Sequence, residues 1–402
     1  MTDQPEAAAP AVAGRPLLAI FLTVLVDVLA LTLILPLLPF YARHFQASEL
    51  QVGALFACFS ACQLVSGPAL GRLSDRIGRR PVLLMSQAGT LVGLLVLGAA
   101  NSLWMLFLGR IIDGATAGNL SIAQAYITDV TRPEDRTKSY ALIGIAFGFG
   151  FLVGPAASGL LAKAYGFHAP PLVAAGLSAL SILLTAVMVK DPPKRARISV
   201  DRTSALGRLL RAPAPRAHLL ELFAYAFSFS QLTSGLGLFL AARLDYDVEH
   251  VGYIFAFSGL IGGLAQGGIG RVARRFGEAK LARFGFLAMA VGYASLAQAY
   301  NLPVLLLATA IGALGGAVTR PAVTTLLTTS VDPSAHGEAL GVSQSLTSAA
   351  QVLGPLSAGL LLGAGHVRGW ALLAGASALL GLLFARTARP RVTNEESPPR
   401  LA

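Results

Sequence analysis

Two acids and a nearby arginine lie inside long apolar segments, where an ionised side chain is costly. Asp27 and Asp113 are the two acids near the middle of predicted membrane spans, and Arg110 lies three residues before Asp113. Charged groups at membrane depth usually face the protein interior or a water-filled cavity and have a function there. Burial raises the pKa of a carboxylic acid, whereas a nearby guanidinium lowers it. This pattern predicts that both acids meet at a cavity as a proton site, with Asp27, which has no arginine in its own span, the more readily protonated.

Polar positions around Asp113 repeat with helical spacing. A continuous helix would carry Arg110, Asp113, Ala117, Ser121 and Gln124 on one face. We expect this face to line the cavity, with Asp27 carrying the proton and with Asp113 and Arg110 adjusting its protonation or sharing the proton. The alternative is a static ion pair between Arg110 and Asp113 that only holds the helix, because structural ion pairs also occur inside membranes.

Composition identifies the elements that must position these residues. The 402 residues are 54% hydrophobic and only 13% charged, whereas soluble proteins average about 25% charged residues. At about 20 apolar residues per crossing, the chain holds about twelve membrane helices and no separate soluble domain, which excludes an attached ATPase domain. The fold class is therefore an all-α membrane protein. The predicted spans are 17–40, 51–70, 82–100, 103–128, 139–163, 170–189, 218–242, 250–269, 282–299, 303–328, 339–363 and 367–386.

Basic residues fall in alternate loops. Of the 31 lysines and arginines, 25 lie in segments on one side of the membrane, four (Arg43, Lys163, Arg243 and Arg368) lie on the other, and two (Arg110 and Arg320) lie within spans. Short loops rich in lysine and arginine stay in the cytoplasm, so the tails 1–16 and 387–402 are predicted to be cytoplasmic. The same placement argues against nucleic acid as a partner, despite a formal net charge of +11.

The two halves of the chain are similar at an offset of about 200 residues, as in many transporters built from repeats. The recurring positions include Gly53 and Gly252, Gly78 and Gly277, and Pro155 and Pro355. This repeat predicts two six-helix bundles, 17–189 and 218–386, joined by a cytoplasmic linker at 190–217. A cavity between the bundles would open to each side of the membrane in turn.

The loop after the second predicted span carries closely spaced glycines and charges. They are Gly71, Asp75, Arg76, Gly78, Arg79 and Arg80. The glycines permit a tight turn and close helix approach, and the acid can pair with a following arginine or cap a neighbouring helix. The segment resembles the G-x-L-x-D-R-x-G-R-R signature of the major facilitator superfamily.

This resemblance implies the major facilitator fold and a charge cluster that latches the outward-facing state. The alternative is a solvated basic turn that only sets the topology. In the second copy of the loop Arg274 stands where the first has Asp75, so only the first copy is expected to latch.

A second glycine motif lies in the fifth predicted span. Gly150, Gly154, Pro155 and Gly159 resemble the G-x-x-x-G-P-x-x-x-G pattern of proton-coupled antiporters in this superfamily. Small residues let two helices touch, and the proline bends the helix. The alternative is a glycine stripe that packs an inert helix.

Within the superfamily, the first half is similar to the tetracycline exporters, which are drug/proton antiporters of the twelve-helix class. The similar stretches run from Val26 to Pro39 and from Ala125 to Asp129. Gly93, Gly262 and Met289 stand where those exporters carry an acid, a histidine and an aspartate. The resemblance therefore implies the architecture and the bacterial inner membrane, but not tetracycline as the substrate.

Further polar residues within predicted spans are candidates for substrate binding. They are Ser121, Gln124, Gln231, Gln266, Arg320, Gln344 and Gln351. Each could instead form a hydrogen bond between helices. We expect a monomeric antiporter that exports an amphiphilic small molecule in exchange for protons. It is expected to need no cofactor or metal. The sequence shows no pairing of a nucleophile with a general base, so enzymatic activity is not expected. The alternatives are a metabolite or lipid transporter and, from another class, a membrane-bound enzyme or sensor.

Overall fold

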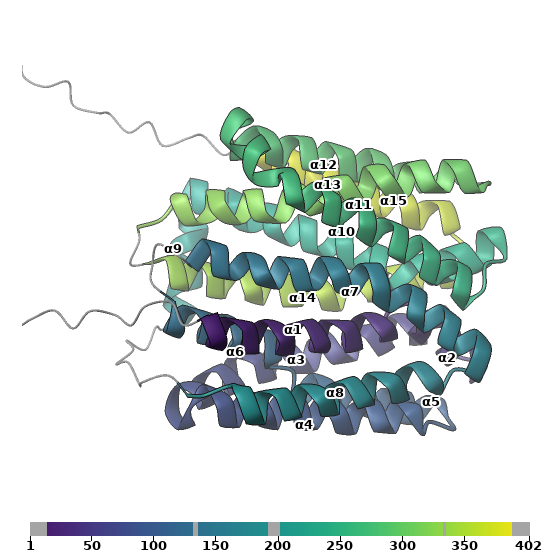
Figure 1. Cartoon of the computed structure of the whole chain (residues 1–402). Coiled ribbons are helices and arrows are strands. Elements are labelled where there is room, and N and C mark those ends of the chain that lie inside the picture. Colours follow the sequence, from purple (N-terminus) through teal and green to yellow (C-terminus); the bar gives the residue numbers. More distant parts are fainter. Residues whose placement is uncertain (1–13, 132–135, 192–201, 333–334, 388–402) are drawn as a thin grey trace, which may run out of the picture.

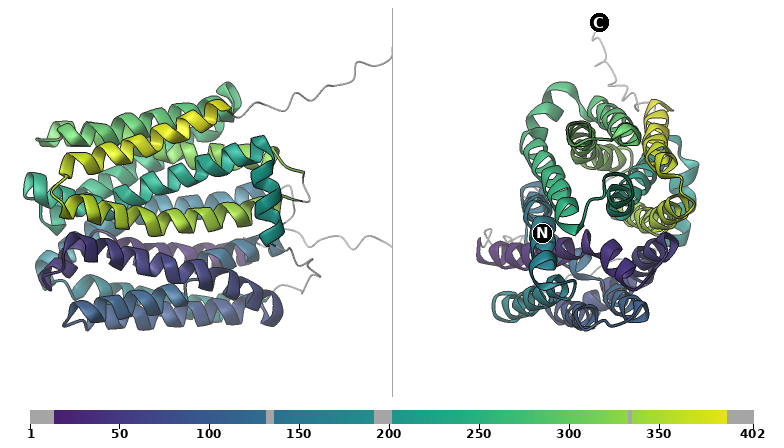
Figure 2. Two further views of the ribbon diagram at one scale, coloured as in Figure 1. Left: turned by 180° about the vertical axis from the view of Figure 1, so that it is seen from behind. Right: turned by 90° about the vertical axis from the view of Figure 1, so that its right-hand side faces the viewer.

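The computed structural model describes residues 14–131, 136–191, 202–332 and 335–387, and the regular structure in these ranges is entirely helical (Figure 1). Two helical bundles lie against each other, as the views from behind and from one end also show (Figure 2). The first bundle contains α1 Gly14–Ile34, α2 Leu37–His44, α3 Glu49–Ile77, α4 Arg79–Gly98, α5 Leu103–Ala115, α6 Asn119–Val130, α7 Arg136–Tyr165 and α8 Ala169–Met188. The second contains α10 Pro213–Leu244, α11 Val248–Phe276, α12 Glu278–Ser295, the short η2 Leu296–Gln298, α13 Leu302–Thr329, α14 His336–Gly363 and α15 Val367–Thr387.

Most of these helices have the length and composition of membrane spans. In the part of the chain that the structure describes, nine helices are long and apolar enough to cross a bilayer. The other crossings run through α5 with α6, through α10, whose middle is rich in serine, and through α12, which has three charged residues near its start. The expected fold class, an all-α membrane protein of two helical bundles, is confirmed.

Two predicted spans are interrupted. The span at 17–40 is divided between α1 and α2 by a turn at Leu35–Pro36, because proline lacks an amide hydrogen and disfavours helical geometry in the residue before it. The span at 103–128 is divided between α5 and α6 at residues 116–118. The prediction of one continuous polar face from Arg110 to Gln124 was therefore wrong.

The second interruption is caused by a side chain from another helix. Ser86 of α4 donates a hydrogen bond to the carbonyl of Thr116 and accepts one from the amide of Gly118 at 2.9 Å. Ser66 of α3 donates to the carbonyl of Gly114 at 2.7 Å. A side chain that inserts into the hydrogen-bond ladder is a common cause of a sharp helix break. The break thus keeps its polar backbone groups satisfied at membrane depth, as the bilayer requires.

The predicted linker at 190–217 contains a helix. Residues 192–201 lie outside the described ranges, but α9 spans Arg202–Arg211, and α10 begins at Pro213, before the predicted start of its span. Proline is favoured in the first turn of a helix, where its missing amide has no partner to lose. Arg208 of α9 pairs with Glu338 of α14, which ties the linker to the second bundle.

The two bundles meet through two equivalent pairs of helices, α7 with α11 and α3 with α14. A β-carbon at Gly53 in α3 would lie 2.3 Å from the carbonyl oxygen of Pro355 in α14. In the other pair, a β-carbon at Gly252 in α11 would lie 2.4 Å from the carbonyl oxygen of Pro155 in α7. The same residue types therefore make the same close contact twice, which reflects the internal repeat.

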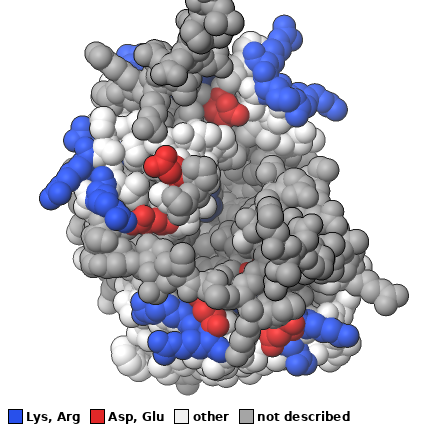
Figure 3. Space-filling model, turned by 90° about the vertical axis from the view of Figure 1, so that its left-hand side faces the viewer, with Lys and Arg blue, Asp and Glu red and all other residues white. Residues whose placement is uncertain are grey.

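These contacts occupy one end of the molecule, which we name the closed end. In α11 the buried residues lie between Val248 and Gly259, and no residue from Leu260 to Phe276 is buried. A β-carbon at Gly263 or Gly267 would meet no atom within 4 Å. We name the end where the bundles separate the open end, and Figure 3 shows that face hollowed between them.

Candidate functional site

Asp27 of α1 lies among polar side chains inside the first bundle. Ser181 of α8, Gln87 of α4 and Asn119 of α6 direct their polar groups at its carboxylate. Gln87 Nε2 also donates to Ser181 Oγ at 2.8 Å, which holds two of these neighbours in place. Asp27 is partly exposed, and within the described ranges no ion pair joins it to a basic residue. Its carboxylate is therefore held by hydrogen-bonding groups that can accommodate either protonation state.

Arg110 and Asp113 form an ion pair beside this group. Arg110 Nη1 lies 3.1 Å from Asp113 Oδ2, and both residues are buried. The guanidinium also stacks on the ring of Phe59 at 4.0 Å from its centroid, while its Nε has no hydrogen-bond partner. Asp113 acts electrostatically on Asp27, so the structure brings together the two acids that the sequence singled out.

Gly93 explains how Asp113 is placed. A β-carbon at position 93 of α4 would lie 3.0 Å from Cβ of Asp113 and 2.8 Å from the carbonyl oxygen of Gly109. Only a glycine allows α4 and α5 to approach this closely. The chain therefore lacks an acid at position 93, but a side chain there would begin 3.0 Å from Cβ of Asp113.

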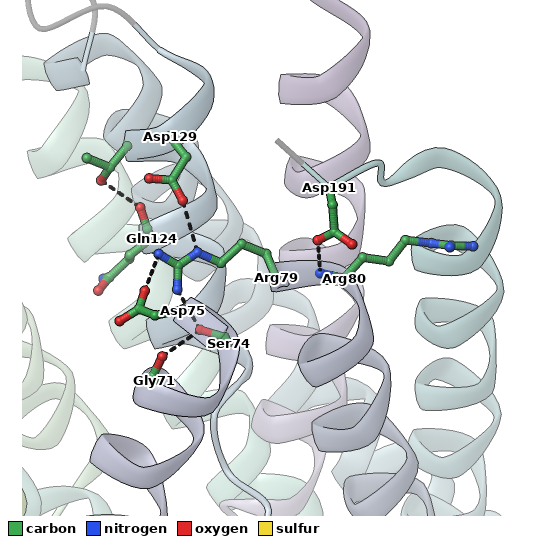
Figure 4. A network of polar contacts seen from close by, with 9 residues as sticks. Gly71, Ser74, Asp75, Arg79, Arg80, Gln124, Asp129 and Asp191 are labelled. Carbon is green, nitrogen blue, oxygen red and sulfur yellow. Dashed lines mark hydrogen bonds and ion pairs between the residues drawn. The ribbon is translucent and has the colours of Figure 1, made fainter. Parts of the chain in front are cut away.

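At the open end, Arg79 is the centre of the charge cluster that we name the latch (Figure 4). Its guanidinium lies 2.7 Å from Asp75 Oδ1 and 2.9 Å from Asp129 Oδ2, and it donates to Ser74 Oγ at 2.5 Å. Arg79 is 5% exposed, so these acceptors satisfy a charge that is almost withdrawn from solvent. Each of these partners of Arg79 belongs to the first bundle.

The turn between α3 and α4 is held by an acid that follows α8. Asp191 accepts a hydrogen bond from the backbone amide of Arg80 at 2.8 Å, at the start of α4 (Figure 4). A negative charge is favourable at a helix N-terminus. Gly78 has φ +112°, and a β-carbon there would lie 2.9 Å from the Asp191 carboxylate. Arg80 donates to the carbonyl of Ala186, which adds a second link to α8.

The second copy of this loop repeats the backbone but carries different charges. Gly277 has φ +80° between α11 and α12, matching Gly78 between α3 and α4. Arg274 occupies the position of Asp75, and Glu278 occupies that of Arg79. The arginine–acid cluster of the first copy therefore has no counterpart of the same composition.

The glycine motif of α7 makes contacts on both sides of the helix. β-Carbons at Gly150 and Gly154 would collide with Val28 and Thr32 of α1, at 2.6 and 2.1 Å. A β-carbon at Gly159 would lie 2.6 Å from Cα of Glu249 in α11. The motif thus packs α7 against its own bundle at two positions and against the opposite bundle at a third.

The substrate-binding candidates do not form one surface. Gln231 is fully buried and donates to Ser357 Oγ at 2.8 Å, which is a contact between α10 and α14. Gln124 lies beside the latch (Figure 4), and Gln266 of α11 lies across from Gly144 of α7. The others, exposed or partly exposed, are Ser121, Arg320, Gln344 and Gln351.

Several residues of the site were not found from the sequence. Gln87, Asn119 and Ser181 were missed because each lies in a different helix from Asp27, and polar residues within spans are common. Asp129 was noted only as part of a similar stretch. Outside this site, Glu221 of α10 was also missed because it lies near the start of a predicted span; it is completely buried, with Oε1 3.3 Å from His218 Nδ1.

Comparisons with known proteins agree with this architecture. A sequence profile of the Major Facilitator Superfamily matches residues 20–299 and 220–401. The chain is 32% identical over 356 residues to the class C tetracycline resistance protein of Escherichia coli, covering 85% of this chain and 88% of that protein. It is 33% identical over 361 residues to the class E protein of Escherichia coli, covering 85% and 87%. The crystal structure of the human organic anion transporter MFSD10 has the same fold, with a TM-score of 0.73, 23% identity and coverage of 95% of this chain and 100% of that one.

Proposed function

Because the chain belongs to the Major Facilitator Superfamily and is a transporter and not an enzyme, we propose that it is a proton-coupled antiporter that exports an amphiphilic small molecule. The observation that carries this proposal is the placement of Asp27. It is an acid inside the first bundle, without an ion-pair partner among the described residues, beside the buried Arg110–Asp113 pair. The similarity to tetracycline resistance proteins supports the export of a drug-like molecule.

The proton step follows from the chemistry of these three residues. When Asp27 is ionised, the hydroxyl of Ser181 and the amides of Gln87 and Asn119 can donate to it; when it is protonated, their oxygens can accept. Asp113 takes the place of the acid that the tetracycline exporters carry at position 93. The guanidinium of Arg110 opposes protonation of the carboxylate it pairs with, so opening of the pair would allow Asp113 to share the proton.

Alternating access would use the two ends of the interface in turn. The close glycine contacts at Gly53 and Gly252 seal the closed end in this conformation. In the opposite conformation the open end must close, and the latch around Arg79 lies where it can stabilise that state. The side chain of Asp75 is 40% exposed, so it remains accessible to the approaching second bundle.

The chain is a multi-pass membrane protein, and we propose that the open end faces the cytoplasm of a bacterium. The charge asymmetry of the loops supports cytoplasmic tails and a cytoplasmic linker at 190–217. We also propose that the chain has two domains, 17–189 and 218–386, and works as a monomer. Labelling of single cysteines in the linker tests this topology, and labelling from the outside of intact cells would contradict it.

The substrate is proposed by class only. Gly262 and Met289 replace polar residues of the tetracycline exporters, and Met289 is fully buried against Tyr293, Ala374 and Ala378. These replacements leave no basis for proposing tetracycline itself. The decisive experiment uses purified protein in vesicles with an imposed pH gradient and a panel of cationic, neutral and anionic drugs. Accumulation against a gradient, abolished by collapsing the pH difference, is the expected result; flux that ignores the pH difference would favour a metabolite or lipid transporter.

A further inference from the structure

Two arginines at the closed end have no acidic partner among the described residues. In the part of the chain that the structure describes, four lysines and arginines lie in or beside the loops at this end, and two of them are neutralised: Arg43 lies 2.6 Å from Glu49, and Lys163 pairs with Glu249. The other two, Arg243 at the end of α10 and Arg368 at the start of α15, are in no ion pair within the described ranges.

Both of these arginines converge on the same aromatic ring. The guanidinium of Arg243 stacks on Tyr300 at 3.8 Å from the ring centroid, and that of Arg368 lies 5.8 Å from the same centroid and donates to the tyrosine hydroxyl. Desolvation tends to raise the pKa of Tyr300, but the hydrogen bonds and charges of Arg368 and Arg243 outweigh it and lower that pKa. Two positively charged guanidinium groups therefore lie around the side chain of Tyr300.

A cavity opens beside this region. Its volume is about 480 Å³, and its lining consists of Arg243 and the segment Gly365–Gly369, which includes His366 and Arg368. The lining contains two guanidinium groups and an imidazole but no acid. Arg243 donates to the carbonyl of Ala297 at 3.3 Å, yet its Nε is buried without a hydrogen-bond partner.

The backbone adds to the positive potential of the cavity. The first turn of α15, which starts at Val367, forms part of the lining. The first amides of a helix have no acceptor within the helix, and the helix dipole is positive there. Like charges that lie close together repel each other, and an anion placed between them removes this repulsion.

We propose that this cavity binds an oxyanion, a phosphate group carried either by a phospholipid headgroup or by a soluble molecule. Arginine suits this role because its planar guanidinium presents paired donors to two oxygens of a phosphate. The cavity is large enough for a phosphate with part of its substituent. The site is separate from Asp27 and the latch, and it does not depend on the proposed antiport.

The test measures thermal unfolding of the full-length protein. Inorganic phosphate is titrated at constant ionic strength against chloride, and in a second arm the protein is placed in nanodiscs of phosphatidylglycerol or of phosphatidylcholine. We expect a saturable rise in the unfolding midpoint of a few degrees with phosphate, with phosphatidylglycerol, or with both. A response to phosphate identifies a soluble ligand, and a response to phosphatidylglycerol alone identifies a headgroup.

Variants decide whether the cavity is responsible. Arg368→Gln changes only an exposed side chain and should abolish the response, as should the double variant Arg243→Gln/Arg368→Gln if it folds. The matched control is Arg43→Gln/Glu49→Gln, which removes a neutralised pair at the same end and should leave the response intact. An absent response in the unmodified protein, or an equal response in Arg368→Gln, would overturn the proposal.

Discussion

The loop between α3 and α4 and the loop between α11 and α12 share a backbone but not a chemistry. Both turn through a glycine of positive φ, Gly78 and Gly277. In the first loop Arg79 is buried between Asp75 and Asp129, whereas the second has an arginine, Arg274, in place of the first acid. The turn requires a glycine in both copies of the repeat, because only glycine adopts this backbone conformation readily. An ion pair with a partly exposed acid such as Asp75 contributes little to folding, so the residue at that position can change.

The same contrast extends through the two bundles. The first bundle has three charged residues within its spans, the partly exposed Asp27 and the buried pair of Arg110 and Asp113. In the middle of α10, the second bundle has neutral contacts instead, such as Gln231 with Ser357 and Ser228 with the carbonyl of Ala374. Packing is thus repeated in both bundles, while the two midspan acids and the arginine that pairs with one of them lie in the first.

The largest effect is expected at Asp27. Asp27→Asn keeps the shape and hydrogen bonding of the protonated acid but cannot release a proton. Uphill transport driven by a pH gradient should fall to the level of empty vesicles, while exchange of substrate without a gradient persists. If vesicles with this variant still concentrate substrate, Asp27 is not the proton site and Asp113 becomes the first candidate.

The next effect is expected at Arg110. Arg110→Gln leaves the carboxylate of Asp113 buried without its partner, and breaking a buried pair costs about 3–5 kcal/mol. We expect lower thermal stability, together with a shift of the pH dependence of transport toward higher pH because protonation of Asp113 is no longer opposed. If stability falls and the pH profile does not move, the pair is only structural.

The equivalent glycines should respond alike. Gly53→Val and Gly252→Val each place a side chain against a proline carbonyl in the opposite bundle, and overpacking of this kind costs about 1–3 kcal/mol. Transport and thermal stability should fall by similar amounts in both variants. Gly263→Ala and Gly267→Ala, at positions with open space, are the controls and should be close to neutral. A strong effect in only one of the two valine variants would contradict the equivalence of the interfaces.

The latch should distinguish the two loops. Asp75→Asn should lower transport about two- to fivefold, because a partly exposed ion pair contributes up to about 1 kcal/mol. Arg274→Gln in the second loop should change transport little. Expression and membrane insertion, measured in parallel, should be unaltered in both. Equal and severe losses would show that the two loops work as a symmetric pair.

The smallest effect is expected in the second bundle. Gln231→Leu removes the hydrogen bond to Ser357 but also removes a buried oxygen without a partner, so stability should change by no more than about 1 kcal/mol. The apparent substrate affinity should also stay the same, since both atoms lie within helix packing. A marked loss of affinity would instead identify Gln231 as a substrate ligand.

Much of the fold could be predicted because its signals are local. Apolar stretches are long enough to identify spans, and Gly154-Pro155 with its repeat at Gly354-Pro355 identifies the duplication. The break at residues 116–118 could not be predicted, since the apolar pattern runs through it. It depends on Ser86, which lies thirty positions earlier in the chain and reaches the backbone only after α4 and α5 have packed.

The candidate site was likewise predictable only in part. The helical class, the repeat and the identity of the midspan charges follow from the sequence alone, because a charge in an apolar span is conspicuous whatever its neighbours are. That Gln87, Asn119 and Ser181 surround Asp27 depends on how the helices pack, since these groups come from three different helices. The same packing brings Arg243 and Arg368, which are far apart in the sequence, to one tyrosine. Contacts between helices depend on how each helix is rotated and bent, and the packing of the whole bundle sets both.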